Sequence, residues 1–170
     1  MQGPGPGDDF ELAGWTMPYW DDDVATFVGA GMQAADTLLL GRVTYQGFAA
    51  AFAESSGPDA EAMNAYRKYV VSTTLERADW SNSSLIKGNV MEEVAKLKQQ
   101  PGQDIGMSGS GTLVQSLLRH NLIDELNLLI YPVVLGSGKR LFEEGVNHAL
   151  KLKQSKTSSS GVLLTTYQVA

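Results

Sequence analysis

The sequence predicts an α/β domain with three layers: a mainly parallel central sheet, helices on both of its faces, and an antiparallel hairpin at the C-terminal end. Three observations predict it. Between residues 36 and 131, short apolar runs typical of strands alternate with helical patterns. After this region, two strand patterns follow each other without a helix between them. Alternation of strands and helices is typical of parallel sheets, whereas consecutive strands pair antiparallel.

Length and composition fit one folded unit. The chain has 170 residues, of which 43% are hydrophobic, so a single domain over residues 1–170 can bury a core of its own. The chain has no cysteine, which excludes disulfides, thiolate metal sites and cysteine nucleophiles. This composition is compatible with the cytoplasm, and we expect a cytoplasmic protein.

Charge and hydropathy argue against several kinds of partner. The net charge of -6 repels phosphate backbones at long range, so nucleic acid is not an expected partner. No apolar run reaches the ~18 residues of a membrane span, and we expect neither a membrane segment nor a secretory signal. The two histidines, His120 and His148, are far apart in the sequence, and we expect no metal site.

The first half of the chain predicts helices separated by short strands. Asp21 can cap the first helix, whose apolar residues Val24, Phe27, Val28 and Ala35 fall on one face. Three consecutive leucines predict a short buried strand. The expected elements are, in order, a helix over 21–36, a strand over 38–40, a helix over roughly 44–53, a helix from Pro58, a strand over 68–73 and a weaker strand over 83–88.

The second half predicts two more helices and four strands. Asn89 can cap a helix that Pro101 and Gly102 end. A long strand is expected to end near Pro132. The expected elements are a helix within 89–102, a strand over 104–109, a helix within 111–122, a strand over 123–135 and closing strands over 149–156 and 161–170.

Three of these strands end in corners rich in glycine and hydroxyl groups. One corner contains Gly41 and Arg42, the next contains 72–74, and the third contains 109–112. In an open α/β sheet, ligands bind beyond the carboxyl ends of parallel strands, where the free N–H groups of a helix start attract anions. An ordinary turn explains each corner alone, but the three together predict a dinucleotide along the sheet edge. The stretch GSGT is not the G-x-G-x-x-G pattern of a Rossmann domain.

These residues also make the chain similar to the dihydrofolate-reductase-like superfamily, in the branch related to the reductase domain of riboflavin biosynthesis. The resemblance covers roughly residues 14–170. It rests on ADTLLLGRVTYQGF, YVVSTTLE, GMSGSGTLVQSLLRHNLIDELNLLIYPVVLGSGKRLF and the closing hairpin. It implies a reductase with NADPH as cofactor. The cofactor-binding residues that it implies are Gly41, Arg42 and Thr44 for phosphate groups, Ser72, Thr73 and Thr74 for the adenosine side, and Gly109, Ser110, Gly111 and Thr112 for the pyrophosphate.

One part of the family's pattern is missing from this sequence. Members begin with an apolar strand that lies centrally in the sheet, and its loop lines the substrate and nicotinamide pocket. Here the sequence starts in the loop that follows. We expect either a start lost upstream or a truncated form, in which the backbone groups of the central sheet need another partner. A rearrangement, or a strand from a second chain, would supply one.

The stretch GWTMPYWDDDVATF is where the resemblance implies the chemistry. It is similar to the dihydrofolate reductase segment in which a Trp-x-x-Pro loop precedes a helix with an acidic residue. Trp15 can stack on a heteroaromatic ring or be an ordinary core or dimer-contact residue. Asp23 is the expected acid, with Asp21 or Asp22 as alternatives. Capping and the helix dipole also favour aspartates at a helix start, so a purely structural role stays open.

Three further residues are candidates for binding substrate. Tyr45 and Tyr131 stand near strand ends. There, each side chain can contact a ligand through its hydroxyl group, or it can be a core residue whose hydroxyl group reaches solvent. Lys139 follows the glycine-rich residues 136–138, which the resemblance places at the border of the active cleft. This lysine can bind a substrate phosphate or remain a solvated residue in a turn.

The resulting hypothesis is an NADPH-dependent reductase that transfers a hydride to a small pterin-, pyrimidine- or carbonyl-type substrate. The alternative is a non-catalytic dinucleotide-binding or structural dimer derived from the same fold. We expect a homodimer, because an incomplete sheet edge pairs readily with another chain.

Overall fold

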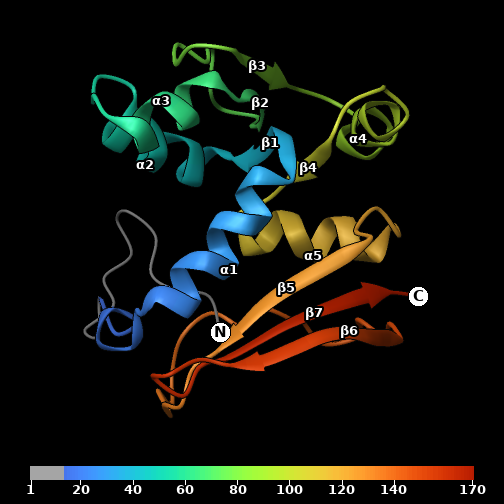
Figure 1. The fold of residues 1–170 in the computed structure, drawn as a ribbon. Helices are drawn as coiled ribbons and strands as arrows, with labels where there is room; N and C mark the ends of the chain where they lie inside the picture. The colour runs from blue at the N-terminus through green and yellow to red at the C-terminus, as the bar shows by residue number, and fades with distance from the viewer. Residues whose placement is uncertain (1–13) are drawn as a thin grey trace.

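The computed structural model describes residues 14–170, and its strands form two sheets (Figure 1). The first sheet is parallel and has the order β3-β2-β1-β4. Its strands are β1 (Ala35–Gly41), β2 (Arg67–Val71), β3 (Ser83–Ile86) and β4 (Asp104–Gly106). The second sheet is antiparallel and has the order β5-β7-β6. Its strands are β5 (Glu125–Ile130), β6 (Leu150–Thr157) and β7 (Leu163–Val169). The predicted fold class is confirmed, although its parallel and antiparallel parts are separate sheets.

Helices cover both faces of the parallel sheet. On one face, Leu38 and Leu40 pack with residues of α2 (Arg42–Phe52) and α3 (Pro58–Ala65). On the other face, Leu39 packs with residues of α4 (Val90–Lys98) and α5 (Gly111–Arg119). The run of three leucines is therefore explained by burial on both faces, which is typical of a parallel sheet.

A further helix connects the two sheets. α1 (Asp22–Gln33) follows a short 3-10 helix, η1 (Met17–Tyr19), and runs from the antiparallel sheet towards the parallel one (Figure 1). Its first turn contributes Val24, which packs with Val162 and Leu164 beside the antiparallel sheet. Near its end, Met32 packs against the cluster around Leu38.

Several expected elements differ in length from the observed ones; for example, the strand expected over 104–109 ends at Gly106, and the strand expected over 38–40 spans 35–41. Ala35 was expected on the first helix, but it is the first residue of β1, buried and in register with Asp104. The strand expected over 123–135 ends at Ile130, two residues before Pro132. Proline has no N–H for a ladder, and it restricts the residue before it. Residues 131–149 contain no helix or strand.

β4 is an edge strand of the parallel sheet, and β5 is an edge strand of the antiparallel sheet. α5 connects these two strands in the chain. Within residues 14–170, no strand pairs with the free side of β4 or with the free side of β5.

Candidate functional site

The three glycine- and hydroxyl-rich corners lie side by side at the carboxyl edge of the parallel sheet. β1 lies between β2 and β4, and its last residue, Gly41, is in register with Val71. Ser72 therefore follows at the same level as Arg42. On the other side of β1, Leu38 is in register with Gly106, so the chain beyond β4 continues beside the end of β1.

Two of these corners touch. A Cβ atom built on Gly41 would lie 2.9 Å from Cβ of Ser110, which is closer than real Cβ atoms approach one another. Only glycine therefore allows β1 to end against this residue. Gly109, which precedes Ser110 through a cis peptide bond, has a φ of 121°, in the region that favours glycine.

Two helices begin at this contact. Gly41 is the N-cap of α2 and offers no side chain to the first N–H groups. Ser110 is the N-cap of α5, and its Oγ accepts a 3.4 Å hydrogen bond from the amide of Leu113. Each helix start carries partial positive charge. Arg42, which is exposed and donates to Oε1 of Gln46 at 3.0 Å, adds a full charge beside them.

The hydroxyl groups of the corners differ in exposure. Ser72 is buried, and its Oγ accepts hydrogen bonds from the amides of Thr74 and Leu75, so it shapes the turn. Thr73 and Thr74 are exposed. Thr112 is exposed on the first turn of α5, and Thr44 is half-buried on the first turn of α2. The exposed threonines are thus the hydroxyl groups of these corners that a ligand can reach most easily.

Tyr45 does not face this edge. It is 5% exposed and belongs to the core cluster between β1 and α2. Its hydroxyl accepts a 2.9 Å hydrogen bond from the amide of Trp80. The structure thus gives Tyr45 the role of a core residue whose polar end is satisfied internally.

Three aromatic residues gather at the end of β5. The Trp15 and Tyr131 rings meet edge to face with centroids 5.0 Å apart, and Tyr19 lies 6.0 Å from Tyr131. Nε1 of Trp15 is buried and has no hydrogen-bond partner among the described residues. Burial raises the pKa of Tyr131, so its hydroxyl keeps its proton at neutral pH. The structure therefore brings together the predicted site residues Trp15 and Tyr131 and adds Tyr19, which no motif in the sequence had marked.

The aspartates at the start of α1 are tied to the turn between β6 and β7. Asp21 caps the helix by accepting from the amide of Val24 at 2.9 Å, and its other oxygen accepts from the amide of Ser160 at 2.8 Å. These hydrogen bonds hold the pKa of Asp21 far below its ordinary value. Asp23 forms a 2.6 Å ion pair with Lys156, and Asp22 is exposed. The contacts of Asp21 and Asp23 are thus structural ones in this arrangement.

Lys139 lies in the irregular segment 131–149 and is exposed. The segment beside it is anchored to α5. Nε2 of the buried Gln115 donates to the carbonyl oxygens of Arg140 at 2.9 Å and Leu141 at 3.0 Å. The sequence did not mark Gln115 as a site residue, because it stands beside Ser116 between the leucines of this helix and no local pattern distinguishes it.

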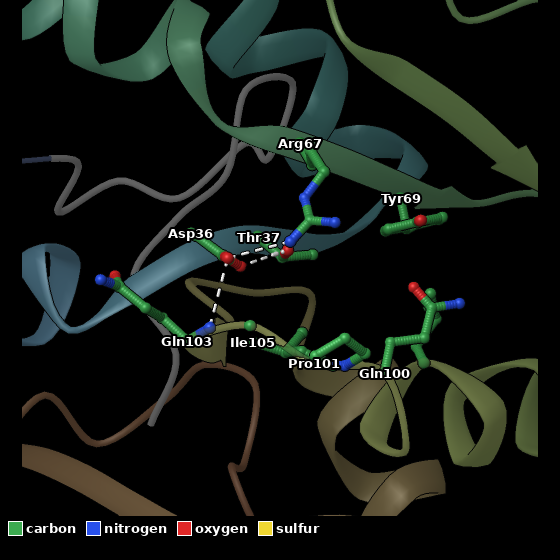
Figure 2. Close-up of a pocket in the computed structure, with 10 residues that line it drawn as sticks. Asp36, Thr37, Arg67, Tyr69, Gln100, Pro101, Gln103 and Ile105 are labelled. Atoms are coloured by element: carbon green, nitrogen blue, oxygen red, sulfur yellow. Dashed lines mark hydrogen bonds and ion pairs between the residues drawn. The ribbon is translucent and has the colours of Figure 1, made fainter.

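A small cavity lies at the opposite end of the parallel sheet, near the amino ends of β1 and β2 (Figure 2). Asp36 and Arg67 form a 2.9 Å ion pair there, and Asp36 also accepts from the hydroxyl of Thr37 and the amide of Gln103. The cavity measures about 20 Å³, which is room for a water molecule and not for a metabolite. This cavity is therefore not a candidate for binding a metabolite.

Two kinds of feature are absent from the described part of the chain: a cluster of metal ligands and a membrane-spanning helix. In residues 14–170, no group of three or more histidine, aspartate or glutamate side chains could hold a metal ion. No helix in this part of the chain is long and apolar enough to cross a membrane.

Two known proteins are similar to this chain in sequence. The uncharacterized protein YyaP of Bacillus subtilis (strain 168) is 36% identical over 140 residues, which cover 78% of this chain and 73% of YyaP. The uncharacterized protein YwjB of the same organism is 31% identical over 133 residues, with the same coverage of 78% and 73%.

Two solved structures show the same fold. The crystal structure of a putative riboflavin biosynthesis protein from Shewanella sp. PV-4 has a TM-score of 0.71 at 24% identity, covering 89% of this chain and 83% of that chain. A dihydrofolate reductase from Enterococcus faecalis, solved with NADP(H) and RAB-propyl, has a TM-score of 0.59 at 14% identity, covering 88% and 83%. The family model of the RibD C-terminal domain matches residues 10–164. The resemblance inferred from the sequence is confirmed, and the chain belongs to the RibD C-terminal domain family.

Proposed function

We propose that the chain is an NADPH-dependent reductase that transfers a hydride to a small pterin-, pyrimidine- or carbonyl-type substrate. The family and the fold support a reductase. The observation that carries the proposal is the contact between Gly41 and Ser110, because it joins the starts of α2 and α5 at one point. Two helix N-termini with Arg42 beside them favour a doubly charged pyrophosphate over a neutral ligand.

The residues at this edge fit a dinucleotide. Gly41 has no room for a side chain, and Gly111 is buried at the start of α5, so backbone lies where a phosphate must approach closely. Arg42, Thr44 and Thr112 supply charge and hydroxyl groups for the phosphates. The adjacent corner, with Ser72 shaping the turn and Thr73 and Thr74 exposed, suits the adenosine side. When bound, the cofactor supplies the hydride, and the protein positions the reacting rings.

The aromatic group at the end of β5 is the proposed substrate side. Trp15 can stack on a heteroaromatic ring, and its Nε1–H, which has no hydrogen-bond partner within residues 14–170, can donate to a ring substituent. Tyr131 can donate from a hydroxyl that keeps its proton. Asp23 is the proposed acid, which requires its ion pair with Lys156 to open when substrate binds. Lys139 is proposed to bind a substrate phosphate.

Cofactor titration tests the binding part of the proposal. A charge-assisted contact to a phosphate contributes about 1.5–3 kcal/mol, so NADPH should bind at least about tenfold more tightly than NADH. Gly111→Val should abolish binding while the far-UV spectrum stays native. Gly29→Val is the matched control, because Gly29 lies in α1 with open space around its Cβ position. Equal affinity for both cofactors would contradict recognition of the 2′-phosphate.

A second candidate function is a non-catalytic dinucleotide-binding or structural dimer. The open edge of β5 favours this second candidate, because the proposed substrate side, with Tyr131 and the aromatic group, directly follows a strand whose outer side is unpaired among the described residues. Single-turnover assays that follow NADPH oxidation with pterin, pyrimidine and carbonyl substrates separate the two candidates. Tight NADPH binding without oxidation by any of these classes would support the non-catalytic form.

A homodimer is proposed for either function. Ile130, Leu150, Leu152 and Leu163 are exposed by 48%, 37%, 51% and 44%, and the strand register places them on one face of the antiparallel sheet. Exposed apolar side chains on one face of a sheet are typical of a surface that another protein chain covers. If a second copy of the chain packed its own antiparallel sheet against this face, the exposed apolar residues of both copies would be buried.

A further inference from the structure

Lys68 is a buried charged residue that the proposed function does not use. It is the second residue of β2 and is 1% exposed. Burial of an ammonium group is costly unless it is well solvated by the protein, and burial here lowers the pKa of Lys68 to about 8. Among the ion pairs of residues 14–170, none involves Lys68.

Three backbone carbonyls surround this ammonium group. Nζ of Lys68 donates to the carbonyl oxygens of Asn64 at 3.1 Å, Tyr66 at 2.8 Å and Ser81 at 3.1 Å, which uses all three of its N–H bonds. The first two carbonyls belong to the end of α3, where the helix leaves carbonyls unpaired and its dipole favours a cation. The third belongs to the connection between β2 and β3. Lys68 therefore fastens this connection to α3.

The same connection is linked to α2 through Trp80. Nζ of Lys68 lies 4.3 Å from the centroid of the Trp80 ring, a cation–π distance. Nε1 of Trp80 donates to Oδ1 of Asn64, and its backbone amide donates to the hydroxyl of Tyr45. Tyr45 is the fourth residue of α2, whose first residue is Arg42 at the glycine-marked edge.

We propose that Lys68 is a positioning residue for the dinucleotide site, acting through Trp80 and Tyr45 on the first turn of α2. The ammonium group fixes the Trp80 ring, the Trp80 amide fixes the Tyr45 hydroxyl, and the phosphate-facing N–H groups of α2 are thereby held in place. This inference rests on the proposed function, because it assigns the first turn of α2 to phosphate binding.

The charge state of Lys68 should control this arrangement. A neutral amine keeps two N–H bonds, so one of the three carbonyls loses its donor. Among the charged groups on the neighbouring elements, Arg67 pairs with Asp36 and Arg77 pairs with Asp79. Within residues 14–170, the acidic residues of these elements at 59, 61 and 76 form no ion pair with Lys68. The Tyr45 hydroxyl accepts from the amide of Trp80, and the Tyr66 hydroxyl donates to the carbonyl of Met32.

The experiment compares four proteins: wild type, Lys68→Met, Tyr45→Phe and Tyr66→Phe. Tyr66→Phe is the matched control, because the Tyr66 hydroxyl donates to the carbonyl of Met32 and lies outside the chain of contacts. Amide exchange over residues 42–45 is measured without ligand, and NADPH affinity is measured by fluorescence. Lys68→Met and Tyr45→Phe should speed exchange in this turn and weaken NADPH binding about three- to tenfold, the scale of one net hydrogen bond. Tyr66→Phe should change neither.

Measuring NADPH affinity as the pH rises separates a positioning role of Lys68 from a general effect of Lys68 on the stability of the fold. Wild-type affinity for NADPH should weaken between about pH 7 and pH 9.5, whereas the affinity of Lys68→Met should stay flat and weak. Unchanged exchange in Lys68→Met and Tyr45→Phe would overturn the chain of contacts, whether or not NADPH binds. Faster exchange over residues 42–45 in these variants, with unaltered NADPH affinity, would overturn the role of Lys68 as a positioning residue for the dinucleotide site. A wild-type protein that does not bind NADPH, with exchange still dependent on Lys68, would contradict the proposed function and this assignment while leaving the contacts intact.

Discussion

The two sheets of the molecule differ sharply in how well they are covered. In β1, six of seven residues are buried and Asp36 is half-buried, whereas all eight residues of β6 are exposed. The parallel sheet has helices on both faces, and the antiparallel sheet packs a single cluster around Val24, Val162 and Leu164. The parallel sheet therefore has a core on both faces, whereas the antiparallel sheet has an outer strand that the described residues leave exposed.

Residue patterns explain this difference. β1 contains an uninterrupted run of apolar residues over 38–40, which suits burial on both faces. β6 reads LKLKQSKT, in which lysines alternate with leucines and then replace them. Lysines on an edge strand hinder uncontrolled pairing, so β6 is built to remain an edge while its leucines share an apolar face with β7.

The largest expected effect contrasts matched leucines in the two sheets. Leu39 is 1% exposed in β1, and Leu39→Ala should lower the free energy of unfolding by about 2–5 kcal/mol. Leu152 is 51% exposed in β6, and Leu152→Ala should cost less than about 1 kcal/mol at concentrations where the protein is monomeric. Urea unfolding of both variants measures the contrast. Equal losses would show that the antiparallel sheet is as complete as the parallel one.

The next effect concerns association through the antiparallel sheet. Leu152→Lys combined with Leu163→Lys should convert a homodimer into a monomer of 18.3 kDa, because charges replace the apolar face. Light scattering coupled to size exclusion measures the mass over a wide concentration range. The control is Lys151→Gln combined with Gln154→Lys, which alters the other face of β6 and should leave the mass unchanged. A wild-type monomer with a concentration-independent, cooperative melt would contradict the dimer.

A smaller, pH-dependent effect tests the contact between α1 and the β6–β7 turn. The amide of Val24 and the groups of Ser160 and Ser159 hold the pKa of Asp21 below its ordinary value of 3.8. As the pH falls below about 3.8, the unfolded chain takes up this proton first, so stability present above that pH is lost.

Asp21→Asn should remove this pH dependence, so the melting temperatures of wild type and variant should converge as the pH falls from about 5 to about 2.5. Asp22→Asn, on the same turn and exposed, is the matched control and should melt like wild type throughout. A difference between wild type and Asp21→Asn that stays constant with pH would contradict the structural role of this carboxylate.

Sequence reasoning could predict the glycine-marked edge but not the hydrogen bonds behind it. Parallel strands end at one edge, so the positions of Gly41, Ser72 and Gly109 in the chain were enough to expect them together. The core role of Tyr45 depends on Trp80, 35 positions away, and the burial of Lys68 depends on carbonyls from α3. Such long-range partners leave no local pattern. Likewise, the length of β5 was overestimated because an apolar run continues past Pro132.

We propose that a nicotinamide dinucleotide occupies the carboxyl edge of the parallel sheet and does not contact the outer strand of the antiparallel sheet. Amide hydrogen exchange with and without saturating NADPH tests this proposal. We expect slower exchange over residues 41–45, 72–75 and 109–113 on binding, with no change over β6. Protection confined to the antiparallel sheet, or unchanged exchange throughout at saturating NADPH, would contradict it.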